Sequence, residues 1–372
     1  MFRWLRYLKY SRRMCSVVIA SAATTSIIVP VACKANESKA FEKNIELDQK
    51  LNKYEMKFLQ FASVEYDGIV YMTPADFLDS MVLDMPKGHV YRRVLSEDSL
   101  NKALSRTPKF SIDNKSLFRE LDRHGIISYS DFLFLLAILT KSDRALRIAF
   151  ILFDRDDNKK IEKDEFLLKN SDDTNLVDTT LIRLFFGCQG NELRSFEEIN
   201  KFRDNLRNEI AELEFNEFSH GRSEITPLDF ARLILRYSSI RKSEYEKYIE
   251  RMREKSSVND QGITFSEYES FSQFLNDLKK FTAAVRLYAR AGIPMSQSEF
   301  HRAVHASTGH ILDKKIVNLL FRLFDTNNDN CLSYTEFIAV MNDRLHRGFQ
   351  VCMSKFGKEA FKQCIRKELA SF

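Results

Sequence analysis

The chain has 372 residues, of which 44% are hydrophobic and 12% aromatic, so there is enough apolar material for a packed core and wholesale disorder is excluded. Glycine (11 residues) and proline (6 residues) are scarce, which disfavours collagen-like and turn-dense β architectures and favours a mainly helical protein. The formal net charge is +5, but residues 1–36 contain six basic and no acidic residues, so the rest of the chain is close to neutral. A near-neutral body gives no electrostatic reason to expect a nucleic-acid partner.

Residues 1–36 are predicted to be a targeting segment. The first 14 residues are rich in arginine, free of acids and interspersed with large apolar side chains, which is the composition of a mitochondrial presequence. Residues 15–33 are uncharged and admit three interpretations: a membrane anchor of near-spanning length, the apolar region of a secretory signal, or a cleaved presequence tail. We expect mitochondrial targeting, and the secretory pathway is the main alternative.

Residues 37–115 are predicted to be an N-terminal domain. Apolar residues recur at helical spacing over residues 46–62, which predicts a helix there. A second helix is expected to open at Thr73-Pro-Ala-Asp76, because proline is favoured in the first turn of a helix.

From residue 116 onward one short pattern repeats: a hydrophobic residue stands four positions before an acid, between helical segments. It occurs seven times, at Ile127–Asp131, Ile161–Glu165, Leu193–Glu197, Ile225–Asp229, Ile263–Glu267, Met295–Glu299 and Leu332–Glu336. This is the second half of an EF-hand loop, in which position 8 forms a short β-bridge and position 12 supplies a carboxylate. Seven copies predict an EF-hand array.

Two of the loops also keep the first half of the motif, and we call residues 154–165 the first acidic loop and residues 325–336 the second. Ca²⁺ takes about 6–8 oxygen ligands, from positions 1, 3, 5 and 12, the carbonyl of position 7 and, often through water, position 9. The predicted ligands are therefore Asp154, Asp156, Asn158, Lys160, Glu162 and Glu165 in the first acidic loop, and Asp325, Asn327, Asp329, Cys331, Ser333 and Glu336 in the second. The sequence predicts two Ca²⁺ sites, with a metal-free structural EF-hand as the alternative for each loop.

Position 6 departs from the usual glycine in both acidic loops, although the turn there needs a positive φ. Asn330 tolerates that conformation, whereas Lys159 adopts it at a cost of roughly 1–2 kcal/mol. We therefore expect the second acidic loop to bind Ca²⁺ more tightly.

The other five loops do not keep the full set of ligands in the first half of the motif, and we call them silent loops. The silent loop Glu120–Asp131 precedes Asp154 by 34 residues, and the silent loop Tyr288–Glu299 precedes Asp325 by 37. Because EF-hands fold in pairs, each acidic loop is expected to pair with the silent loop before it. The predicted fold class is mainly α, an EF-hand array of two lobes that each pair one competent with one degenerate hand. The first lobe is expected at 116–215, the second at 216–345, and an amphipathic C-terminal helix at 346–372.

Two competent EF-hands far apart, silent loops between them and an arginine-rich start resemble the mitochondrial calcium uptake family, the EF-hand regulators of the mitochondrial calcium uniporter. Further segments resemble it as well, and the end of the chain, Phe361–Leu369, is most similar to the third paralogue branch. These segments are Tyr71-Met-Thr-Pro-Ala-Asp-Phe, Gly125-Ile-Ile-Ser-Tyr-Ser-Asp-Phe, Leu184-Phe-Phe-Gly and Asp343-Arg-Leu-His-Arg-Gly-Phe.

The resemblance implies a protein of the mitochondrial intermembrane space, associated with the inner-membrane surface and with the uniporter complex. It implies pairing with a paralogous EF-hand subunit or with itself, through an interchain disulfide at Cys364, and a rearrangement of the lobes on binding Ca²⁺. The residues alone leave open a free thiol at Cys364 or a bridge to Cys352.

No sequence motif of an enzyme active site occurs, so we expect no catalytic activity. The alternative function is an EF-hand calcium buffer or adaptor of the secretory pathway. Such chains tend to be strongly acidic, whereas the body of this chain is close to neutral.

Overall fold

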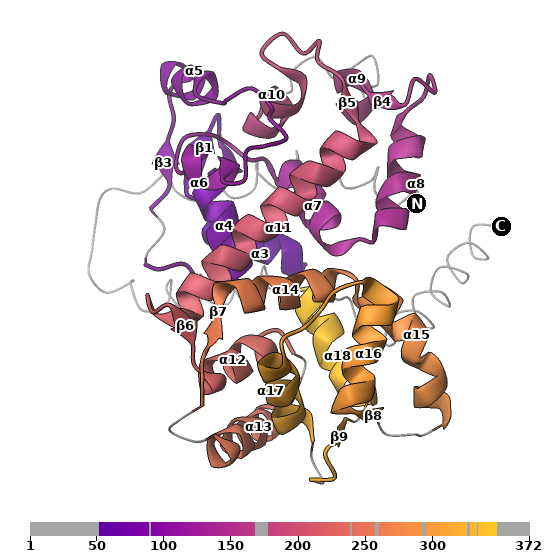
Figure 1. Cartoon of the computed structure of the whole chain (residues 1–372). Helices are drawn as coiled ribbons and strands as arrows, with labels where there is room; N and C mark the ends of the chain where they lie inside the picture. The colour runs from indigo at the N-terminus through magenta and orange to yellow at the C-terminus, as the bar shows by residue number, and fades with distance from the viewer. Residues whose placement is uncertain are drawn as a thin grey trace, which may run out of the picture. The chain divides into compact units, whose positions relative to one another are not determined.

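The computed structural model describes residues 52–88, 91–167, 178–238, 240–256, 260–291, 295–325, 328–332 and 334–347, and these residues are mainly helical (Figure 1). The predicted targeting segment 1–36, nearly all of the predicted C-terminal helix 346–372, and Cys364 lie outside them. Within the described ranges, no helix is long and apolar enough to cross a membrane.

The chain divides into two compact units between Glu214 and Phe215. The helices of the first unit are α3 (Lys53–Phe61), α4 (Pro74–Val82), α5 (Glu97–Ser105), α6 (Leu117–Leu121), α7 (Tyr129–Thr140), α8 (Asp143–Phe153), α9 (Lys163–Leu167), α10 (Thr180–Phe186) and α11 (Phe196–Ser219), which continues past the division. Its strands are β1 (Val64–Tyr66), β2 (Ile69–Tyr71), β3 (Arg93–Val94), β4 (Lys160–Ile161) and β5 (Arg194–Ser195).

The second unit repeats the alternation of helices and two-residue strands. Its helices are α12 (Pro227–Leu235), α13 (Lys242–Lys255), α14 (Phe265–Asn276), α15 (Leu278–Ala291), α16 (Gln297–Thr308), α17 (Lys314–Phe324) and α18 (Tyr334–Leu345). Its strands are β6 (Glu224–Ile225), β7 (Ile263–Thr264), β8 (Met295–Ser296) and β9 (Cys331–Leu332).

Local capping signals fix where the first helices begin. The helix predicted over 46–62 is described from Lys53, where the Asn52 side chain accepts hydrogen bonds from two backbone amides of the first turn. The start predicted at Thr73 is confirmed: α4 begins at Pro74, and Thr73 and Asp76 form a reciprocal capping box.

The short strands pair the loops in chain order. Met72 bridges Ile127, Ile161 bridges Arg194, Ile225 bridges Ile263, and Met295 bridges Leu332. Each of the eight segments stands at the end of a loop and before a helix. The segment at Met72 ends in Asp76 and is an eighth copy of the repeat, which the sequence analysis did not include.

The partner predicted for the first acidic loop was wrong. Its strand β4 pairs with β5, from the silent loop that follows it, and Ile127 of the preceding silent loop pairs with Met72 instead. The second acidic loop pairs through β9 with β8, which belongs to the silent loop ending at Glu299. The two acidic loops therefore occupy opposite places in their pairs.

The register predicted at Leu193 was also wrong by one residue. Arg194 is the residue that bridges Ile161, and Glu198, not Glu197, accepts a hydrogen bond from the Ser195 backbone amide. Leu193 is exposed while Arg194 is buried, since its guanidinium lies over the Phe110 ring at 4.5 Å from the ring centroid. A cation–π contact thus replaces the usual apolar residue at position 8.

Phenylalanine dominates both cores. In the first unit the ring of Phe132 lies 5.6 Å from that of Phe58 and 6.2 Å from that of Phe77, and in the second unit Phe300 lies 5.5 Å from Phe337. Burying each such side chain contributes about 1.5–3 kcal/mol, so these clusters stabilise the helix pairs that hold the loops.

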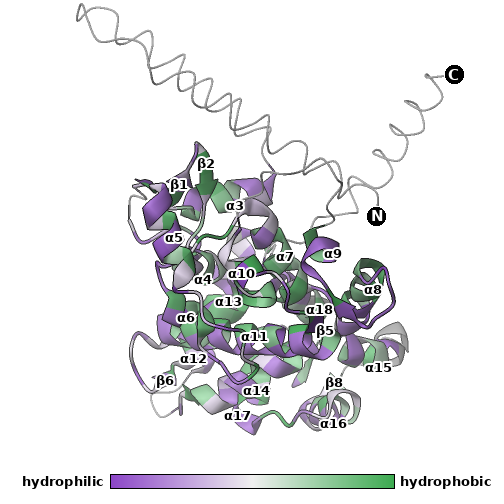
Figure 2. Cartoon of the chain, turned by 90° about the horizontal axis from the view of Figure 1, so that it is seen from above, coloured by the Kyte–Doolittle hydropathy of each residue, from purple (hydrophilic) through white to green (hydrophobic). Residues whose placement is uncertain are grey.

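Helix α8, which leads into the first acidic loop, has apolar residues on both faces (Figure 2). Phe150 is buried, and Leu146, Ala149 and Phe153 are half-buried, as their spacing predicts. The other face is exposed and apolar at Ile148, Ile151 and Leu152.

Candidate calcium sites

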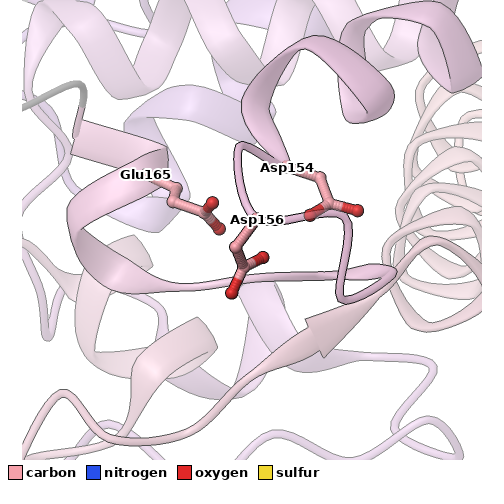
Figure 3. A group of neighbouring side chains, drawn as sticks. All are labelled: Asp154, Asp156 and Glu165. Atoms are coloured by element: carbon pink, nitrogen blue, oxygen red, sulfur yellow. The ribbon is translucent and has the colours of Figure 1, made fainter.

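The first acidic loop brings three carboxylates together. Helix α8 ends at Phe153, Asp154 caps it, and the loop turns back through β4 into α9. Oxygen atoms of Asp154, Asp156 and Glu165 lie within 4.8 Å of one another, around the space between the end of α8 and the start of α9 (Figure 3). A group of acidic oxygens at this spacing is what a hard cation such as Ca²⁺ needs.

Backbone amides hold these carboxylates in place. Glu165 Oε1 accepts a hydrogen bond from the Arg155 amide at 2.7 Å, and Asp154 Oδ2 accepts one from the Lys159 amide at 2.9 Å. Because the amides come from the loop itself, the loop is already wrapped around the position of the ion. The geometry is therefore preorganised for binding.

The remaining predicted ligands of this loop are placed less directly. The Asn158 side chain donates to Asp156 Oδ2 at 2.7 Å and accepts from the Lys160 amide at 2.7 Å. Glu162 is exposed and does not join the three-carboxylate group. These positions are the ones at which EF-hands use an amide oxygen, a carbonyl and a water-mediated contact, respectively.

Both acidic loops adopt the positive φ expected at position 6. The φ angle is +63° at Lys159 and +56° at Asn330, and position 4 is also positive, at Asp157 and Asn328. The turn that glycine usually provides is therefore made by side-chain-bearing residues in both loops.

In the second acidic loop, Asp325 is the informative residue. Its side chain is buried, Oδ2 accepts from the Asn330 amide at 3.1 Å, and Oδ1 is buried with no hydrogen-bond partner among the residues that the structure describes. A buried carboxylate oxygen without a partner is costly, and a bound cation would satisfy it. Asp329 Oδ1 accepts from the Cys331 amide at 2.7 Å, which mirrors the first loop. Asn327 and Ser333 lie outside the described residues, and Glu336 stands in α18 with its side chain not described.

Two cysteines are described, and both carry free thiols: Cys188 is exposed and Cys331 half-buried. Burial raises the pKa of the Cys331 thiol, and the carboxylates of Asp329 and Asp325 raise it further. The thiol therefore stays protonated, which agrees with a ligand role for the carbonyl of Cys331 and not for its sulfur.

The acid at position 12 has a second use that the sequence analysis missed. In silent loops it accepts from the backbone amide of position 9, which is the N-cap of the next helix, as Asp131 does from Ser128 at 2.9 Å and Glu299 from Ser296 at 2.9 Å. The spacing of positions 9 and 12 is that of the capping box, Ser/Thr-x-x-acid. The repeat thus marks helix starts as well as metal loops, and the signal was present in the serine and threonine residues at position 9.

In two silent loops, a basic side chain of the protein pairs with the position-12 acid. Arg222, at position 5 of its loop, donates to Asp229 Oδ2 at 3.1 Å, and Arg232 donates to Oδ1 at 2.9 Å. In the paired loop, Lys315 of α17 lies 2.6 Å from Glu267. In both loops a side-chain cation therefore lies beside the position-12 acid.

Paired helix–loop–helix segments joined by two-residue strands, two of them with acidic loops, define an EF-hand protein. No protein-family model matches the chain. It is 35% identical over 92% of its length, and over 79% of the relative, to calcium uptake protein 3, mitochondrial, of Mus musculus. The chain therefore belongs to the mitochondrial calcium uptake protein family.

Solved structures agree with this assignment. The crystal structure of EFHA2 in its Ca-binding state matches with a TM-score of 0.72 at 37% identity, covering 79% of this chain and 98% of that one. The apo structure of the mitochondrial calcium uniporter protein MICU2 matches with a TM-score of 0.73 at 34% identity, covering 87% of this chain and 97% of that one.

Proposed function

We propose that this protein is a calcium sensor that regulates calcium entry through the mitochondrial calcium uniporter. The observation that carries the proposal is the convergence of Asp154, Asp156 and Glu165 in a chain of the calcium uptake family. The proposed role is regulatory, and the relatives' names, which refer to calcium uptake and to the uniporter, support it.

The fit to Ca²⁺ rests on the donor chemistry of both loops. In the first, the three carboxylates would hold the ion, with Asn158, the Lys160 carbonyl and Glu162 completing the shell. In the second, one oxygen of Asp325 is buried and accepts no hydrogen bond from the described residues, and the sequence supplies Asn327, Asp329, the Cys331 carbonyl, Ser333 and Glu336 at the other ligand positions. Bound Ca²⁺ would supply positive charge at these oxygens, and Glu165 at the start of α9 and Glu336 in α18 would hold the ion from the helix that leaves each loop.

The lobes would transmit the effect of Ca²⁺ binding. We assign the first acidic loop and the silent loop after it to one EF-hand pair in the first unit, and the second acidic loop and the silent loop before it to an EF-hand pair in the second unit. The predicted N-terminal domain, residues 37–115, contributes Met72 to a further pair with Ile127, and residues 346–372 are proposed to form a C-terminal helix. A rearrangement of the helices on Ca²⁺ binding would alter the surface offered to a partner.

Residues 1–36 would direct the protein to mitochondria, and the relatives' names support that destination. We place it in the intermembrane space, at the inner-membrane surface, paired with a paralogue or with itself through Cys364. A dimer band on non-reducing gels that survives in Cys364→Ser and not in Cys352→Ser would contradict the assignment of that bridge.

Titration calorimetry tests the sensor directly. Wild-type protein should show two Ca²⁺-binding events, and Glu165→Gln and Glu336→Gln should each lose one, since each glutamate supplies two oxygens. Glu299→Gln is the matched control, because it changes the position-12 acid of a silent loop and should leave both events intact. The double variant Glu165→Gln/Glu336→Gln should then remove the Ca²⁺ dependence of mitochondrial calcium uptake in cells that depend on this chain. Two undiminished events in the double variant would refute the proposal.

A further inference from the structure

The second acidic loop has a neighbour that the EF-hand pattern does not include. Helices α13 and α17 pack against each other in the second unit (Figure 1), and hydrogen bonds join their C-terminal ends. Arg251 of α13 donates to the Leu323 carbonyl at 2.9 Å, and Arg322 of α17 donates to the Lys255 carbonyl at 3.2 Å. Each helix thus caps the other at the point where α17 passes into the loop.

Lys255, the last residue of α13, approaches the first ligand position itself. Its Nζ lies 4.0 Å from Asp325 Oδ2 and 3.4 Å from the Asp325 carbonyl oxygen. The Asp325 side chain is 5% exposed and that of Lys255 is 28% exposed. A buried carboxylate therefore faces a lysine that retains a path to solvent.

We infer that Lys255 is a built-in competitor of Ca²⁺ at the second acidic loop, and this inference rests on the proposed function. Without metal, the ammonium partly neutralises Asp325. When Ca²⁺ binds, two cations would share one carboxylate in a poorly solvated place, where charges interact more strongly than in water. The ammonium must then withdraw or repel the ion, so Lys255 lowers the affinity of this site.

The two arginines that cap the ends of α13 and α17 do not share this property. Arg251 contacts only the Leu323 carbonyl and the Tyr248 ring in the described contacts, and Arg322 pairs with Asp260 at 2.7 Å. Lys255 is the one whose charge is directed at a metal-ligand position. Because coupling is reciprocal, Ca²⁺ at Asp325 would in turn weaken the hold of Lys255 on the end of α17. Ca²⁺ binding to the loop would thereby change the contact between α13 and the end of α17.

The experiment uses the full chain in a Glu165→Gln background, so that only the second acidic loop binds Ca²⁺. Lys255→Met should bind Ca²⁺ at least about fivefold more tightly by calorimetry, in the usual range of coupling between two sites. Arg251→Met is the matched control: it removes a cap from the same helix end without removing a charge from Asp325, and its affinity should not rise. Lys255→Arg keeps the charge and should behave as the background does.

Thermal unfolding gives a second readout. Metal-free Lys255→Met should melt at a lower temperature than the background, because Asp325 then loses its counter-ion, and saturating Ca²⁺ should raise its melting temperature by more. Unchanged or weaker affinity in Lys255→Met, or an equal gain in Arg251→Met, would overturn the inference while leaving the calcium site in place. If the background chain bound no Ca²⁺, both the second site and the inference would fall.

Discussion

At the scale of single residues, position 6 shows how a loop can depart from its pattern without losing its shape. Lys159 and Asn330 both adopt the left-handed conformation, at φ +63° and +56°. For lysine this conformation is strained, whereas asparagine tolerates it. The sequence alone predicted this difference, because the requirement for positive φ is fixed by the position within the loop.

We expect Lys159→Gly to stabilise the metal-free protein by about 0.5–1 kcal/mol, the relief of strain less the extra freedom that glycine gives the unfolded chain. Urea unfolding of the two variants Lys159→Gly and Asn330→Gly compares the loops. Asn330→Gly should gain almost nothing, and an equal gain in both would show that backbone strain is not the cause.

At the scale of secondary-structure elements, the position-12 acid of the repeat has two functions, metal binding and helix capping. Thr73 accepts from the Asp76 amide at 3.1 Å while Asp76 accepts from the Thr73 amide at 2.8 Å and from the Ser63 hydroxyl at 2.6 Å. Asp76 belongs to neither acidic loop, so its described hydrogen bonds cap α4 and join it to Ser63. Helix capping explains why so many position-12 acids stand in loops without metal ligands.

Asp76→Ala should therefore destabilise the protein by about 1–2 kcal/mol and leave Ca²⁺ stoichiometry unchanged, since it removes a cap and no metal ligand. Chemical unfolding and calorimetry measure the two effects. Asp98→Ala, on the exposed first turn of α5, is the control and should change the stability by less than about 0.5 kcal/mol. A lost binding event in Asp76→Ala would contradict the capping role.

Helix starts and the acidic loops could be predicted because their signals lie within a few residues of one another. The pairing of the loops could not be predicted, since the β-bridges join residues far apart in the sequence. Every copy of the repeat contains a similar short strand, so the repeat itself does not specify the partner. The shift at Leu193 arose because Arg194 fills an apolar position with a guanidinium stacked on Phe110. Lys255 and Asp325 are 70 residues apart in the sequence, so no local sequence pattern predicts their contact.

At the scale of the whole molecule, the two units hold equivalent aspartates in opposite electrostatic settings. Burial raises the pKa of Asp131 in the first unit, and hydrogen bonds from Ser128 offset this only in part. In the second unit burial also acts to raise the pKa of Asp229, but the Thr226 hydroxyl and the Arg232 guanidinium outweigh it, so the pKa is lowered. Both are position-12 acids of silent loops, and they form a matched pair.

The two carboxylates should therefore respond oppositely to acid. Asp131 is costly when charged, so wild type gains stability relative to Asp131→Asn as the pH falls from 7 through the raised pKa, toward the unfolded value of about 3.9. Asp229 stabilises the fold when charged, so Asp229→Asn should cost roughly 1–3 kcal/mol at pH 7. That cost should shrink as the pH falls below about 3.9.

Hydrogen exchange resolved by unit measures both variants, because a chain of two units need not unfold in one step. On acidification, the stability of the first unit in Asp131→Asn should fall relative to wild type. The stability of the second unit in Asp229→Asn should move closer to that of wild type. The same direction of change in both variants would contradict the assignment of their environments.

The double use of the position-12 acid has a consequence for how such a chain can vary. Substitutions that remove the ligands of positions 1, 3 and 5 leave the capping box, the two-residue strand and the phenylalanine core untouched, as the pairing of β6 with β7 illustrates. Loss of metal binding then changes the stability of the fold little, and a loop can lose its ligands while its strand pair and helices remain. Metal binding could be regained by changes at the same few positions, because the position-12 acid is already retained for capping the helix.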